Sequence, residues 1–429
     1  MSSVSSSSCT SDNGCCEVFT DIVKSVQPGF VTRSELPSHA VNKNIGIWTV
    51  LKHAIGKDLS RFSIPIVFNE PLSMLQRLAE YMEYHELIAQ ATFADEPSRR
   101  IELVTAFAMS TLASTNVRMS KPFNPLLYET FELCRPELGF EFVAEQVSHH
   151  PPISAFYARG PNYEFSGTVE PKIKFWGRSI EVHPNASIML KLLNWKETYT
   201  WQAASCSVHN IIIGRMYMCL SGPMIIKCAE SDLQVIVKFR GAGKNGPDVV
   251  VTGDVMKTST RQCLRTIFGN WTEFLGSTNW STFQANKHTF ETEFKSLEKR
   301  NLHQERVVMF REGKLLWRVY KRPPKCKDYY YMTYFSLALN EAPTEPNKLP
   351  RTDSRLRPDI RLLESGDVDR ASREKERLET KQRSKVKIRS GKEITEPKWF
   401  TVGKENGRTT YTFNGKYFER DFAGCDDIF

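Results

Sequence analysis

The spacing of apolar residues gives the chain a helical first part. Residues 45–59 have apolar side chains at helical spacing, which predicts a short amphipathic helix. Two longer helices are predicted over 72–91 and 98–114, each next to a proline that suits the first turn of a helix. We expect the apolar stripes of these two helices to face the core; they consist of Leu72, Leu75, Leu78, Ala79, Met82, Ile101, Val104, Phe107 and Ala108.

Between residues 140 and 271 the apolar period changes to the alternation typical of strands. Phe140, Phe142 and Ala144 alternate with polar residues, and later segments repeat the pattern. Turn residues recur about every 8 to 12 positions, which favours a sandwich or a barrel. Because the region is too long for a small sandwich, we predict a large antiparallel barrel, and large barrels can hold ligands inside.

The segments after this region are more varied. Residues 281–306 indicate a polar, partly helical connection, and 314–339 returns to the strand pattern. Residues 366–388 predict a highly charged helix. The aromatic-rich stretch 399–429 is expected to pack back on the body of the protein.

Residues 1–44 form a Ser-rich tail that we predict to be disordered, because it has few apolar anchors. Within it, residues 17–21 (EVFTD) are a weak candidate motif for a tether protein of the endoplasmic reticulum. A tail without a partner is the favoured alternative.

Composition places the chain among ordinary soluble proteins. It has 429 residues, of which 40% are hydrophobic and 25% charged. No stretch approaches the roughly 20 apolar residues of a membrane-spanning helix, and the start lacks the features of a signal peptide. We therefore expect a cytoplasmic protein, peripheral on membranes. Its 10 cysteines form no Cys-x-x-Cys pair, which favours buried free thiols over a zinc site or a disulfide framework.

The positive charge is concentrated in one region. The net charge is +9, and residues 351–392 contain 14 Lys and Arg against 8 Asp and Glu. Such a patch suits phosphates on nucleic acid, on a lipid headgroup or on a membrane surface. The charged helix lacks interleaved aromatic residues and is punctuated by acidic ones, so nucleic acid is the disfavoured partner.

A pair of histidines followed by a pair of prolines interrupts the strand region at residues 145–156 (EQVSHHPPISAF). A turn at a barrel rim could aim both His149 and His150 at one anionic group. Anion binding and a structural role remain open, with metal binding or catalysis as a weaker alternative. No third zinc ligand stands at a readable spacing, so no metal site is predicted.

Two further segments carry candidate polar groups. Residues 121–129 (KPFNPLLYE) predict a stiff turn that presents Lys121 and Asn124, although a plain surface loop is the alternative. Lys375, Glu379 and Arg383 share one face of the charged helix. A solvated helix would explain them equally well, but its few apolar positions suggest another role.

Two common chemistries find no support. Residues 241–246 (GAGKNG) match a dinucleotide-binding pattern by letters only, because a strand follows them and not a helix, so we predict a hairpin loop. A lipid-ester hydrolase using His149 or His150 as a base would need a nucleophile and a carboxylate in register, and neither is placed.

Taken together, residues 121–129, 145–156, 349–359 (LPRTDSRLRPD) and 374–383 closely resemble the motifs of the oxysterol-binding protein-related family of lipid-transfer proteins. The resemblance extends over about residues 48–429 and is strongest to the short animal form, without the pleckstrin-homology and ankyrin regions of longer members.

The resemblance implies a mainly β (α+β) fold, an incomplete antiparallel β-barrel of about 19 strands around a hydrophobic lipid tunnel. The lipid-transfer domain would span residues 45–429. It would comprise a lid (45–59, with Trp48, Leu51 and Ile55), helices (60–116), the barrel (117–340) and a C-terminal helical subdomain (341–429).

The resemblance also implies a function and a site. The function would be exchange, at membrane contact sites, of a sterol or oxysterol against a phosphoinositide (PI4P or PI(4,5)P2), without catalysis or cofactor. A phosphatidylserine/phosphoinositide exchanger and a sterol sensor are alternatives. The residues of the implied headgroup site are Lys121, Asn124, His149, His150, Lys375 and Arg383, with Glu379 orienting the basic side chains.

The chain departs from the family pattern at two positions. Tyr128 stands where the family usually has Gly, so we expect a negative φ there and a shifted loop. Arg351 replaces the second proline of a Leu-Pro-Pro-Thr motif and is expected to add positive charge near the tunnel mouth.

Overall fold

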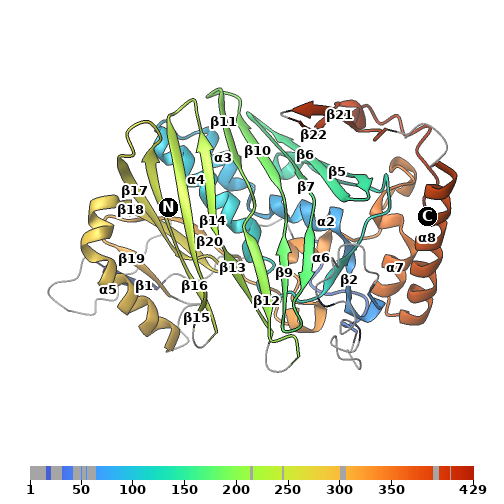
Figure 1. The fold of residues 1–429 in the computed structure, drawn as a ribbon, viewed down its shortest axis with the longest axis horizontal. Coiled ribbons are helices and arrows are strands. Elements are labelled where there is room, and N and C mark those ends of the chain that lie inside the picture. Colours follow the sequence, from blue (N-terminus) through green and yellow to red (C-terminus); the bar gives the residue numbers. More distant parts are fainter. Residues whose placement is uncertain are drawn as a thin grey trace.

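The computed structural model describes residues 16–20, 31–41, 50, 55, 64–212, 216–243, 246–299, 306–389, 396–405 and 407–429. Figure 1 shows a broad twisted sheet with helices behind it, a helical group at one side and the C-terminal helices at the other. None of the helices in those ranges has the length and apolar composition needed to span a bilayer.

The largest element is an antiparallel sheet of 12 strands, in the order β20-β18-β17-β16-β15-β14-β11-β10-β7-β6-β5-β4. Because β4 and β20 are separate edges, the sheet curls without closing. Its strands are β4 (Thr130–Arg135), β5 (Phe140–His149), β6 (Pro152–Gly160), β7 (Tyr163–Val169), β10 (Ser187–Leu192), β11 (Glu197–Trp201), β14 (Pro223–Cys228), β15 (Leu233–Gly243), β16 (Gly246–Lys257), β17 (Cys263–Asn270), β18 (Phe274–Asn279) and β20 (Lys314–Arg318).

Four smaller sheets complete the strand content of the described ranges. A four-stranded sheet has the order β13-β12-β9-β8, and three strand pairs are β1–β19, β2–β3 and β21–β22. Their strands are β1 (Cys16–Thr20), β2 (Asn69–Ser73), β3 (Lys121–Phe123), β8 (Lys172–Phe175), β9 (Ser179–His183), β12 (Ser205–His209), β13 (Tyr217–Ser221), β19 (Arg306–Phe310), β21 (Phe400–Glu405) and β22 (Arg408–Phe413). The mainly β, incomplete antiparallel architecture is therefore confirmed.

Strand β5 shows how alternation builds two cores. Phe142 and Ala144 face the main core, which also contains the helices of the first part of the chain. Val143 and Val147 point the other way, into a second core with Trp399 and other aromatic residues of the 399–429 stretch. Burying such side chains stabilises the fold by about 1.5–3 kcal/mol each. The predicted return of 399–429 onto the body is confirmed, and Figure 1 shows β21 and β22 beside β5 and β6.

The β4 edge of the large sheet is partly covered by residues 352–353. At this edge, Thr130 N donates to Thr352 O at 2.9 Å, and a bridge joins Thr130 to Asp353.

The interior pair β15–β16 runs up to Gly243 and Gly246, so the predicted hairpin at 241–246 is confirmed.

Helix α4 (Pro97–Ala113) confirms the predicted 98–114 helix, and its apolar stripe is buried. The predicted 72–91 helix is wrong as a single element. Ser73 and Gln76 form a capping box that starts the helix after the proline. The region is divided into β2, α2 (Met74–Ala79), the 3-10 helix η4 (Glu80–Tyr84) and α3 (Glu86–Thr92), yet its predicted apolar stripe is buried.

The prediction of strands over 314–339 is wrong beyond β20. Tyr330 and Tyr331 have positive φ, which ends any extended run. Helix α6 (Tyr334–Ala338) then starts at Thr333, whose side chain accepts a hydrogen bond from Ser336 N. The polar connection is α5 (Trp280–Lys299), which is helical as predicted but for a non-helical residue at Asn286.

The predicted charged helix is confirmed as α8 (Val368–Arg389), packed against α7 (Pro358–Glu364). Ala371 and Leu378 are its fully buried apolar residues within the described part. Short 3-10 helices are η3 (Ile66–Phe68), η5 (Pro136–Leu138), η6 (Cys326–Tyr329), η7 (Pro346–Lys348), η8 (Ser354–Leu356) and η9 (Lys416–Glu419).

The first 44 residues depart from the predicted disorder in two stretches. Residues 16–20 form β1, which pairs with β19 and includes most of the candidate tether motif. Residues 31–41 are attached to the body, because Arg33 donates to Leu337 O and to Glu364 at 2.6 Å each and Leu36 is buried. Such isolated anchors leave no periodic pattern in the sequence.

Most of the predicted lid, including Trp48 and Leu51, lies outside the described residues. Val50 packs against the Phe175 cluster of the four-stranded sheet. Ile55 is 50% exposed, and its Cδ1 lies 3.9 Å from a Cβ placed on Gly177. The two described residues of the predicted lid, Val50 and Ile55, therefore lie at the β8–β9 end of the molecule.

Candidate functional site

The Lys121 loop is fixed by side chains from distant segments. Strand β3 lies parallel to β2, and Asn69 Nδ2 donates to Lys121 O at 3.1 Å. Lys121 Nζ donates to Asn124 Oδ1 at 2.5 Å. The two predicted donors of this loop therefore lie side by side, on a backbone that Asn69 holds in place.

A buried arginine, Arg357, forms hydrogen bonds that hold the base of the Lys121 loop. Arg357 Nη1 donates to Asn124 O at 2.9 Å and to Glu129 Oε2 at 2.8 Å, while its other nitrogens bind Asp359. The guanidinium carbon lies 5.3 Å from the centre of the Phe123 ring. Charge-assisted hydrogen bonds of this kind are about twice as strong as neutral ones, so Arg357 rigidifies the base of the loop.

Helix α8 brings a second cation to the same place. Lys375 Nζ donates to Ile64 O and, at 3.4 Å, to Asn69 Oδ1. One asparagine side chain thus contacts both the Lys121 loop and Lys375. Figure 1 shows α7 between β2 and α8, and α8 contacts η3, the 3-10 helix that directly precedes β2.

Burial is the largest influence on the pKa values of both lysines, and the charge of Lys375 adds to it at Lys121. Burial and the positive charges of Lys375 and Arg357 lower the pKa of Lys121 to about 8, and the attraction of Glu379 only partly offsets them. The pKa of Lys375 is also lowered, by burial and by Arg357, against an opposing contribution from Glu379. An anion placed here would relieve this repulsion.

The paired histidines lie at the turn between β5 and β6. Their ring centres are 4.4 Å apart; His149 is half-buried and His150 exposed. Gln382 of α8 accepts a hydrogen bond from Leu127 N at 2.8 Å, which points its amide nitrogen toward His149 Nε2 at 2.6 Å. The same amide nitrogen lies 3.2 Å from His149 Nδ1, so an unprotonated ring nitrogen of His149 accepts its hydrogen bond.

His149 is consequently neutral at physiological pH. Burial and the neighbouring His150 lower its pKa to about 4. The sequence suggested two imidazoles gathered with cationic side chains around one anion. In the structure His149 offers an N–H donor to such an anion but no charge, because a buried imidazole loses hydration when it is protonated.

The other predicted residues of α8 lie at the margin of the site. The Arg383 side chain is 63% exposed; it forms an ion pair with Glu379 at 3.8 Å and donates to Thr380 Oγ1 at 2.9 Å. Glu379 lies within electrostatic reach of Lys121 and Lys375. The structure thus brings Lys121, Asn124, Lys375 and Glu379 together, joins His149 to the same helix, and leaves His150 and Arg383 at the exposed edge.

Both departures from the family pattern have a structural outcome. Tyr128 has φ +68°, so the predicted negative φ is wrong: the tyrosine takes the left-handed conformation itself, at a cost of about 1–2 kcal/mol. Its N–H donates to Gln146 O at 2.9 Å, which fixes the loop. Arg351 is exposed, and its charge helps to lower the pKa of Asp427, so it lies near an acidic segment.

Three residues that organise the site were not singled out from the sequence. They are Asn69, Arg357 and Gln382. Arg357 lies within the quoted 349–359 motif, and its position just before a proline and an aspartate was a usable signal. Asn69 and Gln382 act through single long-range contacts and gave none. Among the described residues, no group of three or more His, Cys, Asp or Glu is arranged to hold a metal ion.

Comparison with known proteins identifies the class of molecule. The family model described as Oxysterol-binding protein matches residues 46–422. The chain belongs to this family, whose members are lipid-binding proteins and not enzymes, so a lipid-ester hydrolase is not retained as an alternative.

Individual relatives agree with this assignment. The chain is 40% identical to human oxysterol-binding protein-related protein 2 over 92% of its own length and 88% of the relative. It is also 40% identical to human oxysterol-binding protein-related protein 1, again over 92% of this chain, but it spans only 44% of that protein, less than half its length. The predicted likeness to the short animal form is confirmed.

Solved structures share the fold. The Osh1 ORD domain in complex with cholesterol has a TM-score of 0.79 at 31% identity, covering 92% of this chain and 94% of that one. The Osh3 ORD of Saccharomyces cerevisiae in complex with PI(4)P has a TM-score of 0.75 at 31% identity, covering 95% and 100%.

Proposed function

We propose that this chain binds a sterol or oxysterol and a phosphoinositide (PI4P or PI(4,5)P2) at one site and exchanges them between membranes. The observation that carries the proposal is the meeting of Lys121 and Lys375, two cations whose mutual repulsion is incompletely offset by nearby carboxylates. Separate relatives in complex with cholesterol and with PI(4)P support both cargoes.

The headgroup would be held by donors from three segments. Lys121 has N–H groups beyond the one that contacts Asn124, and Asn124 has an exposed amide. His149, His150, Lys375 and Arg383 would complete the set, with Glu379 orienting the basic groups. Each charge-assisted hydrogen bond to a phosphate contributes about 1.5–3 kcal/mol.

The apolar part of either lipid would occupy a hydrophobic tunnel inside the curled sheet. Residues 45–59, with Trp48, Leu51 and Ile55, would close it as a lid. Each Å² of apolar surface removed from water stabilises the closed complex by about 25 cal/mol. No covalent step and no cofactor is involved, so exchange would depend on competition between the two lipids for one interior.

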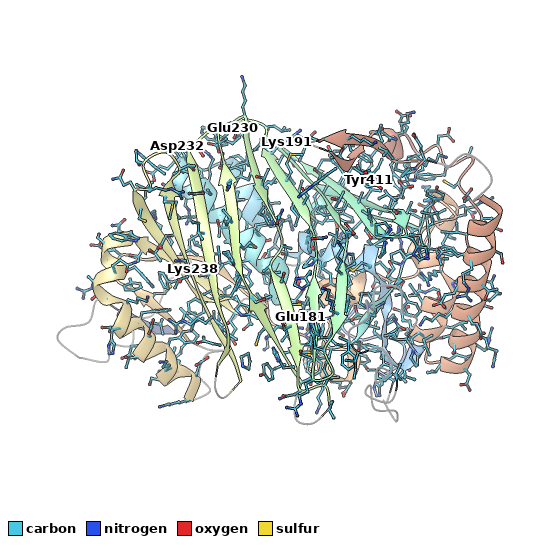
Figure 2. The ribbon with its side chains drawn as sticks, in the orientation of Figure 1. Glu181, Lys191, Glu230, Asp232, Lys238 and Tyr411 are labelled. Atoms are coloured by element: carbon cyan, nitrogen blue, oxygen red, sulfur yellow. The ribbon has the colours of Figure 1, made fainter. Side chains whose placement is uncertain are left out.

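Membrane docking is proposed at the β8–β9 end, where the lid segment arrives. Trp176 is 52% exposed and Ile212 is 43% exposed, beside the equally exposed Ile55. The Lys174 ammonium lies 6.0 Å from the Trp176 ring centre, and Arg178 is exposed. In Figure 2, Glu181 on β9 lies toward this end, and Lys191, Glu230 and Asp232 are labelled at the opposite end of the sheet. Exposed aromatic and aliphatic residues with basic neighbours suit an anionic lipid surface.

The proposed location is cytoplasmic, peripheral on organelle membranes and at membrane contact sites. A tether protein of the endoplasmic reticulum that binds residues 17–21 remains the weaker part of the prediction, because β1 pairs with β19 there.

The headgroup assignment is tested by liposome-to-liposome transfer of PI4P. Lys375→Ala is expected to slow transfer at least tenfold, since it removes one charge-assisted contact. Arg373→Ala is the matched control, because Arg373 is an exposed cation on the same helix. Equal rates for the two variants would contradict the assignment. Native mass spectrometry of the purified protein would identify the cargo; phosphatidylserine in place of sterol would overturn the sterol part.

The docking assignment is tested by sedimentation with phosphatidylserine vesicles. Trp176→Ala is expected to weaken binding about tenfold, as the loss of one anchored indole implies. Val402→Ala, on β21, is the control because Val402 is an exposed apolar residue (37%) on another face. Unchanged vesicle binding by Trp176→Ala would place the docking surface elsewhere.

A further inference from the structure

Residues 426–429 (DDIF) pack between α8 and the loop that follows Lys121. Ile428 is 7% exposed and forms a cluster with Leu126 and Leu378, which are 4% and 0% exposed. Phe429 packs against the edge of this cluster. The segment therefore fills the space between two of the three parts of the headgroup site.

Polar contacts secure the same segment to α8. Lys381 Nζ forms an ion pair with Asp427 Oδ2 at 3.0 Å and also donates to Phe429 O. Lys385 Nζ donates to Asp427 O. The hydrogen bond and charge of Lys381 lower the pKa of Asp427, so its carboxylate stays ionised below neutral pH. Lys381 and Lys385 of α8 are thus both bonded to residues 426–429.

The positions that the segment joins are those next to the proposed ligands. Leu126 lies two residues after Asn124, and Leu378 directly precedes Glu379. Gln382, which contacts both Leu127 N and His149, borders the same small cleft as Ile428. Without residues 426–429, Leu126 and Leu378 would lose the apolar partner that covers them, and this half of α8 would keep few buried apolar contacts.

We propose that residues 426–429 act as a latch that positions α8 against the Lys121 loop for headgroup binding. The latch supplies no ligand. It sets the spacing between Lys121 and Asn124 on one side and Glu379, Gln382 and Arg383 on the other. The effect of the latch on headgroup binding rests on the proposed function. The packing of the latch against α8 is independent of that function.

The test is Ile428→Asp in the full chain, which places a charge between Leu126 and Leu378. We expect amide hydrogen exchange of α8 from Leu378 onward to accelerate at least tenfold, because local opening becomes easier. PI4P affinity should fall about tenfold, a size typical of coupling between sites. Sterol extraction and the thermal midpoint should change little, since the main core is untouched.

Two further variants keep the result interpretable. Ile428→Val keeps the apolar contact and should retain PI4P affinity within about twofold, whereas Asp427→Asn should weaken it about threefold by removing one ion pair. Val402→Asp is the control for an added charge at an exposed apolar position away from α8.

The outcomes separate the two hypotheses. Unchanged exchange in α8 of the Ile428→Asp protein would overturn the latch, and so would an equal loss of PI4P and sterol binding, which would indicate general destabilisation. Absence of PI4P binding by the unmodified protein would contradict the proposed function instead, while the exchange measurement would still decide whether the segment holds α8.

Discussion

Two clusters of charge balance their cations differently. One, called the hub, contains Arg118 and joins β2, η4 and α6. The other, called the margin, is the cluster around Lys121 beside α8. In the hub, Arg118 is fully buried; it binds Glu70 at 2.8 Å and Glu80 at 2.7 Å and also donates to Ser336. Burial opposes its charge, but the two carboxylates outweigh burial and raise the pKa of Arg118. At the margin, burial and neighbouring cations lower the pKa of Lys121 to about 8.

This difference distinguishes charges that stabilise the fold from charges that still have donors for a ligand. The hub satisfies Arg118 with the carboxylates of Glu70 and Glu80, and these contacts join β2, η4 and α6. The Lys121 cluster keeps unused donors and net repulsion, which a bound anion would satisfy. The hub also contains Arg77, whose pKa is lowered by burial and by the charge of Arg118, so a lowered pKa indicates a candidate site only where exposed donors such as the Asn124 amide lie beside it.

The largest effect is expected from breaking the hub. Arg118→Met should reduce the free energy of unfolding by about 3–5 kcal/mol, because the buried Glu70 and Glu80 would lose their shortest ion pairs and keep only the longer ones to Arg77 at 3.4 and 3.9 Å. Chemical denaturation measures this loss. Arg370→Ala, which removes an exposed pair at 3.5 Å from Asp367, should cost less than about 1 kcal/mol. A comparable loss in both would contradict the contrast.

Removing the lysine of the margin should affect binding and not stability. Lys121→Met is expected to leave the thermal midpoint unchanged or slightly higher, because it removes a repelled cation. PI4P extraction from liposomes should fall about 10- to 100-fold, as loss of one charge-assisted bond implies. A large fall in the thermal midpoint would mean that Lys121 is structural after all.

The same lysine predicts a pH dependence with a defined sign. Its pKa is about 8 in the folded chain against an ordinary value of 10.5, so the unfolded chain binds more protons between these values. Its unfavourable contribution to stability is therefore fully present below pH 8 and is relieved as pH rises toward 10.5. PI4P affinity should fall between pH 7 and 9, and Lys121→Arg, which stays charged, should flatten that fall. Binding measured by titration at several pH values tests both statements.

A smaller effect is expected from the bridge between α8 and the histidines. Gln382→Leu removes the amide that donates to the neutral His149 ring, so the pKa of His149 should rise slightly from about 4, because burial and His150 still lower it. Nuclear magnetic resonance titration of the imidazole would measure the change. Gln382→Glu, which adds a carboxylate, should raise that pKa further; an unchanged pKa in both variants would rule out the bridge.

The sequence predicted those features that depend on local pattern. Alternation over 140–271, the charged helix and the stripe of α4 were sufficient for the fold class, and the motifs around Lys121, His149 and Lys375 supplied the residues of the candidate site. The division of 72–91 depends on one capping box at Ser73, which competes with a helical stripe that continues through it. The strand prediction failed after Arg318, because β20 ends there and the chain goes on to η6, to the positive-φ residues Tyr330 and Tyr331, and to α6.

The unpredicted parts of the site depend on tertiary contacts. Asn69 and Gln382 each join segments more than 50 residues apart, with separations of 52 and 255 residues along the chain. The neutral state of His149 follows from its burial and from His150, and the Gln382 amide that contacts it is oriented by Leu127 N. Tyr128 shows the converse, because the family pattern indicated a glycine-like backbone and the tyrosine adopts it.

The separate edges of the 12-stranded sheet have a consequence for cargo. A closed barrel fixes its girth, because every strand is bonded to two neighbours around the ring. Within the described residues, the outer side of β4 has a backbone bond to Thr352 near Thr130, and β20 forms the other end of the row. The sheet is thus an open cuff, and a change of its circumference between β4 and β20 would break none of its strand ladders. Under the proposed function, such a cuff would fit a flat, rigid ring system and a bundle of flexible hydrocarbon chains in turn.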